Sequence, residues 1–143
     1  MDCHEVILGQ DGATACTDVT GFGLLGHLVE MTKASPVALS LDLKMIPWLD
    51  GACATAAAGL LSSLQPQNIR LRRAVALNNV DTSDPRYLLL FDPQTAGGLL
   101  ASVRSDRAAT CVTQLRAAGY SDTVVIGVVE PPSGRDQPIT VTG

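Results

Sequence analysis

Residues 15–27 constrain the fold most, because a strand-like run there leads through two glycines into a helical pattern. The strand-favouring residues end at one carboxylate, Asp18, and Gly21 and Gly23 follow it. Glycine accepts positive φ and lets a backbone approach a neighbour or a ligand closely. A helix that begins after such a loop offers unpaired N–H groups and the positive end of its dipole. The stretch therefore predicts a strand–loop–helix junction of an α/β protein.

The junction has two interpretations. In the functional one, Asp18 gives a hard oxygen ligand to Mg²⁺, which proteins usually hold through one or two carboxylates plus substrate phosphates. In the structural one, the loop is an ordinary turn that Asp18, Thr17 or Thr20 caps or braces. No lysine follows the glycines, so the stretch is not a Walker phosphate loop.

Composition and charge narrow the class of protein. The chain has 143 residues, 46% hydrophobic and 17% charged, which predicts one globular domain rather than a disordered chain. The formal net charge of −4 argues against a nucleic-acid partner. The apolar runs are too short to span a membrane, and the first residues do not resemble a signal peptide. The cysteines show no zinc-site spacing. Each lies among apolar or small residues, which predicts free thiols and fits a reducing cytoplasm.

The apolar periodicity predicts strands alternating with helices, in the order β-α-β-α-α-β-α-β. We expect strands at 13–19, 37–43, 99–103 and 123–130, an edge strand at 139–141, and helices at 23–34, 51–60, 86–91 and 106–118. The valine-rich run within 123–130 predicts a strand buried on both faces. The helix at 86–91 is favoured because Asp84 and Pro85 make a good pair for the N-cap and first helical position. The segment 62–68 is expected to be a loop, and 69–79 is ambiguous. This order indicates an α/β sandwich with a mixed sheet flanked by helices.

Single residues have structural alternatives to a functional role. On the helix at 23–34, Leu24, Leu28 and Met31 predict the apolar face, which Leu25 broadens, and His27 is interpreted as a surface or half-buried residue. The cluster Arg70, Arg72 and Arg73 is interpreted as a solvated helix face, with a phosphate or subunit contact as the alternative.

A second motif, Asp92-Pro-Gln-Thr-Ala-Gly-Gly-Leu-Leu, occupies residues 92–100 and leads from a polar loop into a strand. Its proline and glycines are compatible with a sharp turn alone. With both motifs in view, the chain resembles the C-terminal domain of selenophosphate synthetase (selenide, water dikinase). The family often has Ser where this chain has Ala96. A weaker similarity extends to the superfamily that includes aminoimidazole ribonucleotide synthetase.

The resemblance implies a division of the chain and a set of site residues. Residues 1–12 are expected to be a linker from a missing N-terminal ATP-binding domain, and 13–143 the C-terminal domain. Asp18 matches a family residue that contributes to the Mg²⁺ sites of the ATP cleft. The expected cofactor-binding residues are Thr17, Gly21, Gly23, Asn68, Asp92, Thr95, Gly97 and Gly98. No catalytic residue is expected here, because the family's Cys or selenocysteine nucleophile and its catalytic Lys have no match.

The implied reaction of the whole enzyme converts ATP, selenide and water to selenophosphate, AMP and orthophosphate. ATP and Mg²⁺ are expected to be held mainly by the missing domain. The enzyme is expected to be a cytoplasmic homodimer without nucleic-acid or membrane partners, and this fragment alone is expected to be inactive. Two alternatives stay open: another superfamily enzyme, of the aminoimidazole ribonucleotide synthetase or thiamine-phosphate kinase type, and a non-catalytic interaction module. Phe22 and the residues 24–27 favour the selenophosphate branch.

Overall fold

The computed structural model describes residues 12–143, which separate into two compact units. The first unit comprises the described residues up to Asp18 together with residues 99–125, and the second comprises residues 19–98 and 126–143. The linker predicted at 1–12 lies outside the described residues except for Gly12. No helix within residues 12–143 is both long and apolar enough to cross a membrane.

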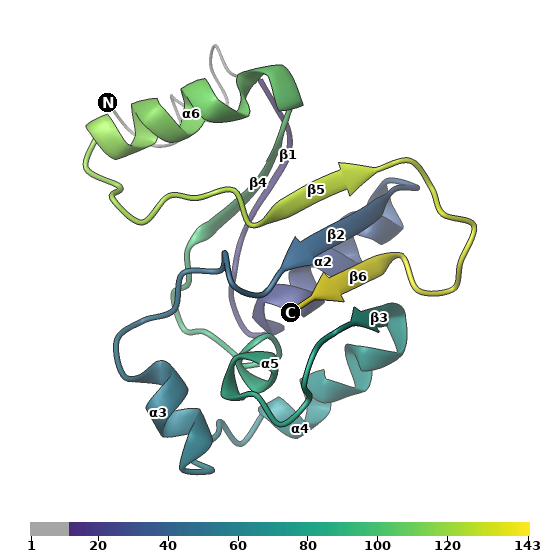
Figure 1. Cartoon of the computed structure of the whole chain (residues 1–143), viewed down its shortest axis with the longest axis vertical. Helices are drawn as coiled ribbons and strands as arrows, with labels where there is room; N and C mark the ends of the chain where they lie inside the picture. The colour runs from purple at the N-terminus through teal and green to yellow at the C-terminus, as the bar shows by residue number, and fades with distance from the viewer. Residues whose placement is uncertain (1–11) are drawn as a thin grey trace. The chain divides into compact units, whose positions relative to one another are not determined.

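The first unit is a two-stranded antiparallel ladder with one helix (Figure 1). Strand β1 (Ala13–Asp18) pairs with β4 (Leu99–Val103), and helix α6 (Ser105–Ala117) follows β4 directly. The core of this unit is small and is formed by Cys111 and Leu115 packed against Ala13, Ala101 and Val103. Gly119 has φ +102°, as expected for the glycine that ends a helix.

The second unit is built on a four-stranded mixed sheet in the order β3-β6-β2-β5 (Figure 1). These strands are β2 (Ala38–Asp42), β3 (Val75–Asn78), β5 (Gly127–Glu130) and β6 (Ile139–Thr142). Strand β6 runs parallel to both β3 and β2, whereas β5 runs antiparallel to β2. The α/β class and the mixed sheet predicted from the sequence are therefore confirmed.

Two strand predictions were wrong. The edge strand expected at 139–141 is the central strand β6, and Ile139 and Val141 are completely buried. The doubly buried strand expected at 123–130 forms only at Gly127–Glu130, on an edge, where Val128 is 61% exposed. Valine favours an extended backbone, but its propensity does not determine which strands lie on either side.

Five helical segments belong to the second unit. They are α2 (Gly23–Ala34), α3 (Ala52–Ala57), α4 (Gln65–Asn68), the 3₁₀ helix η1 (Ile69–Ala74) and α5 (Pro85–Leu89). Helix α2 has the predicted bounds, but the face that it buries is rotated relative to the predicted apolar face. The buried side chains are Leu25, Leu28, Val29 and Thr32, while Leu24 and Met31 are only half-buried. The predicted and the observed apolar faces overlap on this helix, and tertiary packing determines which of them is buried.

The shorter segments also differ from expectation. The loop predicted at 62–68 contains α4, where Pro66 lies in the first turn, a position that tolerates proline. The ambiguous stretch 69–79 becomes η1 followed by β3. Helix α5 begins as predicted, because the Asp84 side chain accepts a hydrogen bond from the Arg86 backbone N–H. Side-chain hydrogen bonds from Arg86 hold the pKa of Asp84 below its ordinary value.

The central position of β6 gives a stability prediction. Replacing Ile139 by Ala should lower the free energy of unfolding by about 2–5 kcal/mol, because it leaves a cavity in a fully buried site. The matched control is Val128→Thr, which keeps the β-branched shape on the exposed strand and should change stability by less than about 0.5 kcal/mol. Urea unfolding of both variants measures the difference. Equal losses would contradict a central β6.

Candidate functional site

The two glycine motifs, which lie far apart in the sequence, are hydrogen-bonded to each other in the second unit. Val19 N donates to Gly98 O over 2.9 Å, and Gly97 N donates back to Val19 O over 2.9 Å. Gln94 N also donates to Thr20 O over 3.1 Å. These bonds satisfy backbone groups that lie outside any regular strand pair. The two motifs thus form one backbone network rather than two separate loops.

Two of the predicted glycines are required by packing. Gly23 has φ +67°, and a Cβ there would lie 2.8 Å from the carbonyl carbon of Phe91 and 2.9 Å from Asp92 O. A Cβ on Gly97 would overlap Val19 O. These contacts are closer than a side chain tolerates, so the fold alone accounts for both glycines.

Gly21 and Gly98 are different. A Cβ at either position would meet nothing within 4 Å, and both residues are exposed. Thr95 is exposed as well. Packing within the described residues therefore gives no reason for glycine at positions 21 and 98, and both present an unobstructed backbone.

Asn68 bridges the two sides of this network. Its side chain is buried, and Nδ2 donates to Gly21 O over 2.9 Å and to Phe91 O over 3.1 Å. Helix α4 is held in place nearby because Gln65 Nε2 donates to Leu88 O over 3.2 Å. Both amide protons of Asn68 are therefore used to position backbone.

His27 supports the loop from the first turns of α2, a role that the sequence analysis missed. Its side chain is half-buried as expected, and Nε2 accepts a hydrogen bond from Thr20 N over 2.9 Å. Thr20 Oγ1 lies 3.2 Å from the same nitrogen, and the Phe22 ring lies 5.7 Å from the imidazole between centroids. Accepting the backbone N–H requires Nε2 to be unprotonated. The sequence signal that could have indicated this role is a histidine in the first turns of a helix that follows a loop.

Asp18 and Thr17 belong to the first unit. Asp18 is the last residue of β1, pairs with Leu99 and is exposed. Within residues 12–143 its carboxylate takes part in no hydrogen bond or ion pair, while Thr17 Oγ1 donates to Asp18 O over 3.1 Å. The described part of the chain contains no group of three or more His, Cys, Asp or Glu arranged to hold a metal. Asp18 fits a Mg²⁺ ion only if phosphates or other segments supply the remaining ligands.

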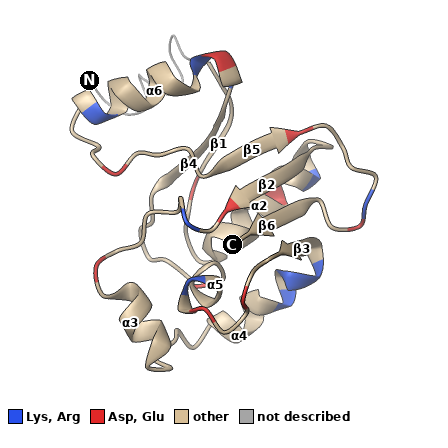
Figure 2. Cartoon of the chain, in the orientation of Figure 1, with Lys and Arg blue, Asp and Glu red and all other residues tan. Residues whose placement is uncertain are grey.

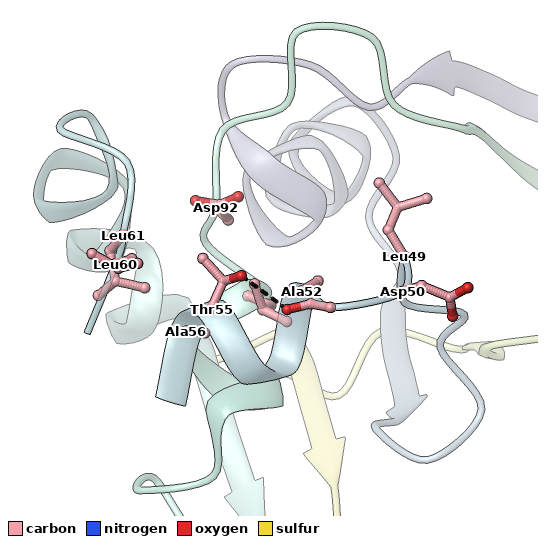
Figure 3. Close-up of a pocket in the computed structure, with 10 residues that line it drawn as sticks. Leu49, Asp50, Ala52, Thr55, Ala56, Leu60, Leu61 and Asp92 are labelled. Carbon is pink, nitrogen blue, oxygen red and sulfur yellow. Dashed lines mark hydrogen bonds between the residues drawn. The ribbon is translucent and has the colours of Figure 1, made fainter. Parts of the chain in front are cut away.

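Asp92 lies at a separate pocket of about 280 Å³ in the second unit (Figure 3). Its carboxylate accepts a hydrogen bond from Gln94 Nε2 over 3.1 Å. The pocket is mainly apolar and is lined by Leu49, Asp50, Gly51, Ala52, Thr55, Ala56, Leu60, Leu61, Leu89 and Asp92. In Figure 3, Leu60 and Leu61 lie on one side of the α3 helix and Leu49 on the other. Sequence reasoning identified only Asp92 among these residues, although the leucines that flank the Ala-rich helix were an available signal.

The family profile described as "AIR synthase related protein, C-terminal domain" matches residues 2–136. The chain belongs to this family. It is also similar to curated proteins named "Selenide, water dikinase", which confirms the resemblance inferred from the two motifs. The relative from Rhizobium meliloti is 41% identical over 113 residues, covering 79% of this chain and 32% of the relative.

Other relatives with the same name have similar identity and coverage. That from Clostridioides difficile is 36% identical over 117 residues, covering 80% of this chain and 33% of the relative. The relative from Treponema denticola is 42% identical over 106 residues, covering 73% of this chain and 29% of the relative. This AIR synthase related domain therefore spans about a third of the length of the curated relatives it matches.

The packing of the glycines gives a second prediction. Gly23→Ala should destabilise the domain by at least about 2 kcal/mol, since it adds left-handed strain and a clash with the Phe91 backbone. Gly21→Ala, two residues away in open space, is the matched control and should change stability by less than about 0.5 kcal/mol. Thermal or urea unfolding measures the stability of the two variants. A well-tolerated Gly23→Ala would show that the loops do not approach this closely.

Proposed function

We propose that this domain is the C-terminal part of an ATP-dependent phosphotransferase that makes selenophosphate from selenide, ATP and water, with release of AMP and orthophosphate. The observation that carries the proposal is the similarity to curated proteins named "Selenide, water dikinase" over about four fifths of the chain. The shared family profile and the hydrogen-bonded pair of motifs support it.

In this proposal residues 13–143 form the C-terminal domain and 1–12 a linker from an N-terminal domain that supplies the nucleophile. No residue of this chain attacks or transfers the phosphate. Asp18 gives one carboxylate oxygen to Mg²⁺, with Thr17 beside it on the strand. When bound, Mg²⁺ offsets phosphate charge and orients the transferred group.

The remaining predicted residues divide into two roles. Gly23, Gly97 and Asn68 shape the backbone network, because packing or hydrogen bonding already accounts for them. Gly21, Gly98 and Thr95 are exposed, and they are the proposed points of backbone or hydroxyl contact with nucleotide phosphates. Asp92 is proposed to contact the nucleotide from its pocket.

The whole enzyme is proposed to act as a cytoplasmic homodimer on ATP and selenide, without nucleic-acid or membrane partners. The net charge of −4 supports the absence of a nucleic-acid partner. The isolated chain is proposed to be inactive, since the nucleophile, the catalytic lysine and most phosphate ligands lie elsewhere.

The metal role of Asp18 gives a third prediction. In the full-length enzyme that carries this domain, Asp18→Asn should reduce selenide-dependent AMP formation by at least about tenfold, because a charged ligand is lost where phosphate charge develops. Raising Mg²⁺ should restore part of the activity. The melting midpoint should change little, since this carboxylate has no partner among the described residues.

The control is Asp122→Asn, which removes another exposed carboxylate from the same unit and should leave activity within about twofold. If Asp18→Asn kept its activity while its melting midpoint fell sharply, Asp18 would be a structural residue. Selenide-dependent AMP formation by the purified isolated chain would contradict the proposed division of the enzyme.

A further inference from the structure

Within residues 12–143, four arginines of the second unit form no ion pair, although the chain is acidic overall. They precede β3 or lie in the β5–β6 connection. They are Arg70, Arg72 and Arg73 on η1, and Arg135. All four are exposed, and the ion pairs of the described residues involve Lys33, Arg86 and Arg104 instead. In Figure 2 the basic residues gather on the turns before β3 and recur in the β5–β6 connection.

The 3₁₀ geometry of η1 explains why these arginines face outward. Three residues per turn place side chains at i and i+3 on one face. Leu71 packs toward α2, where its Cδ1 lies 3.2 Å from the position of a Cβ on Gly26, and half-buried Ala74 shares its face. Arg70 and Arg73 share a different face. Packing of the apolar face therefore fixes the direction of the basic one.

The β5–β6 connection brings Arg135 to the same place. Gln137 Nε2 donates to Val75 O over 3.1 Å, and Leu39 N donates to Pro138 O over 2.8 Å. The first bond holds the connection against the start of β3, directly after η1, and the second holds it against β2. The result is an open hollow of about 610 Å³ lined by Arg73, Gly134, Arg135, Asp136 and Gln137.

We propose that this hollow binds a small anion that carries two linked phosphate groups. Guanidinium groups present planar donor pairs that match phosphate oxygens, and they are more weakly hydrated than ammonium groups. Arg73 and Arg135 bind the first phosphate at the hollow, and Arg70, on the same face of η1, binds the second. Asp136 also lines the hollow and opposes binding. The residues of this site do not include the Mg²⁺ ligand proposed at Asp18, and the proposal does not depend on the proposed enzyme activity.

The test titrates the 143-residue chain with inorganic pyrophosphate by calorimetry in metal-free buffer, so that a Mg²⁺-dependent phosphate site stays silent. We expect saturable binding with one equivalent of pyrophosphate. Arg73→Gln and Arg135→Gln should each weaken the affinity by at least about tenfold, as expected for loss of a charge-assisted hydrogen bond. Asp136→Asn should strengthen it. Circular dichroism and melting midpoints verify that each variant is folded.

The matched control is Arg107→Gln, which removes one exposed arginine from α6 in the other unit and should leave the affinity within about twofold. Absence of saturable binding at millimolar pyrophosphate would overturn the proposal. Equal weakening by all three arginine variants would overturn it too, because it would indicate net charge rather than a local site. Binding of ADP without binding of pyrophosphate would show that a nucleoside, not a diphosphate, is recognised, and would likewise overturn it.

Discussion

The second unit depends on the close approach of backbone to backbone at two glycines. Gly97 sits against the Val19 carbonyl and Gly23 against the backbone of Phe91, at separations that exclude a Cβ. This contact lets the loops exchange hydrogen bonds directly, and so polar backbone groups of two irregular segments are paired with each other. A side chain at either glycine would separate the loops and leave these groups unpaired, which is costly in a part-buried region.

Two side chains, those of Asn68 and His27, add hydrogen bonds to the backbone network of the two loops. Asn68 gives both amide protons to carbonyls on either side of the network, and His27 accepts the N–H of Thr20. Each acts on backbone and is itself placed by a helix, α4 or α2. The candidate site is thus a pair of hydrogen-bonded loops in which two exposed glycines, Gly21 and Gly98, are not explained by packing among the described residues.

The sequence was sufficient to predict local structure but insufficient to predict which strands and loops contact each other. The bounds of α2 and the Asp84 cap were predictable because periodicity and capping are local signals. The central place of β6 was not, since a short Ile-Thr-Val-Thr run carries no information about its neighbours. For the same reason the motifs predicted glycine loops but not the Val19–Gly97 contact, and a helical histidine predicted nothing about Thr20. The motif around Asp18 suggested a metal ligand and the family resemblance supported it, and the lack of a partner for its carboxylate within the described residues is compatible with that role.

The position of β6 has a consequence for how the chain is made. Strand β6, which lies between β2 and β3, follows every other described element in the sequence, so the ribosome delivers it after them. Until it emerges, β2 and β3 carry open edges that invite pairing with another chain. Their contacts also have a large sequence separation, which slows folding. Nascent chains of this domain are therefore expected to need protection from aggregation until residues 139–142 have left the exit tunnel.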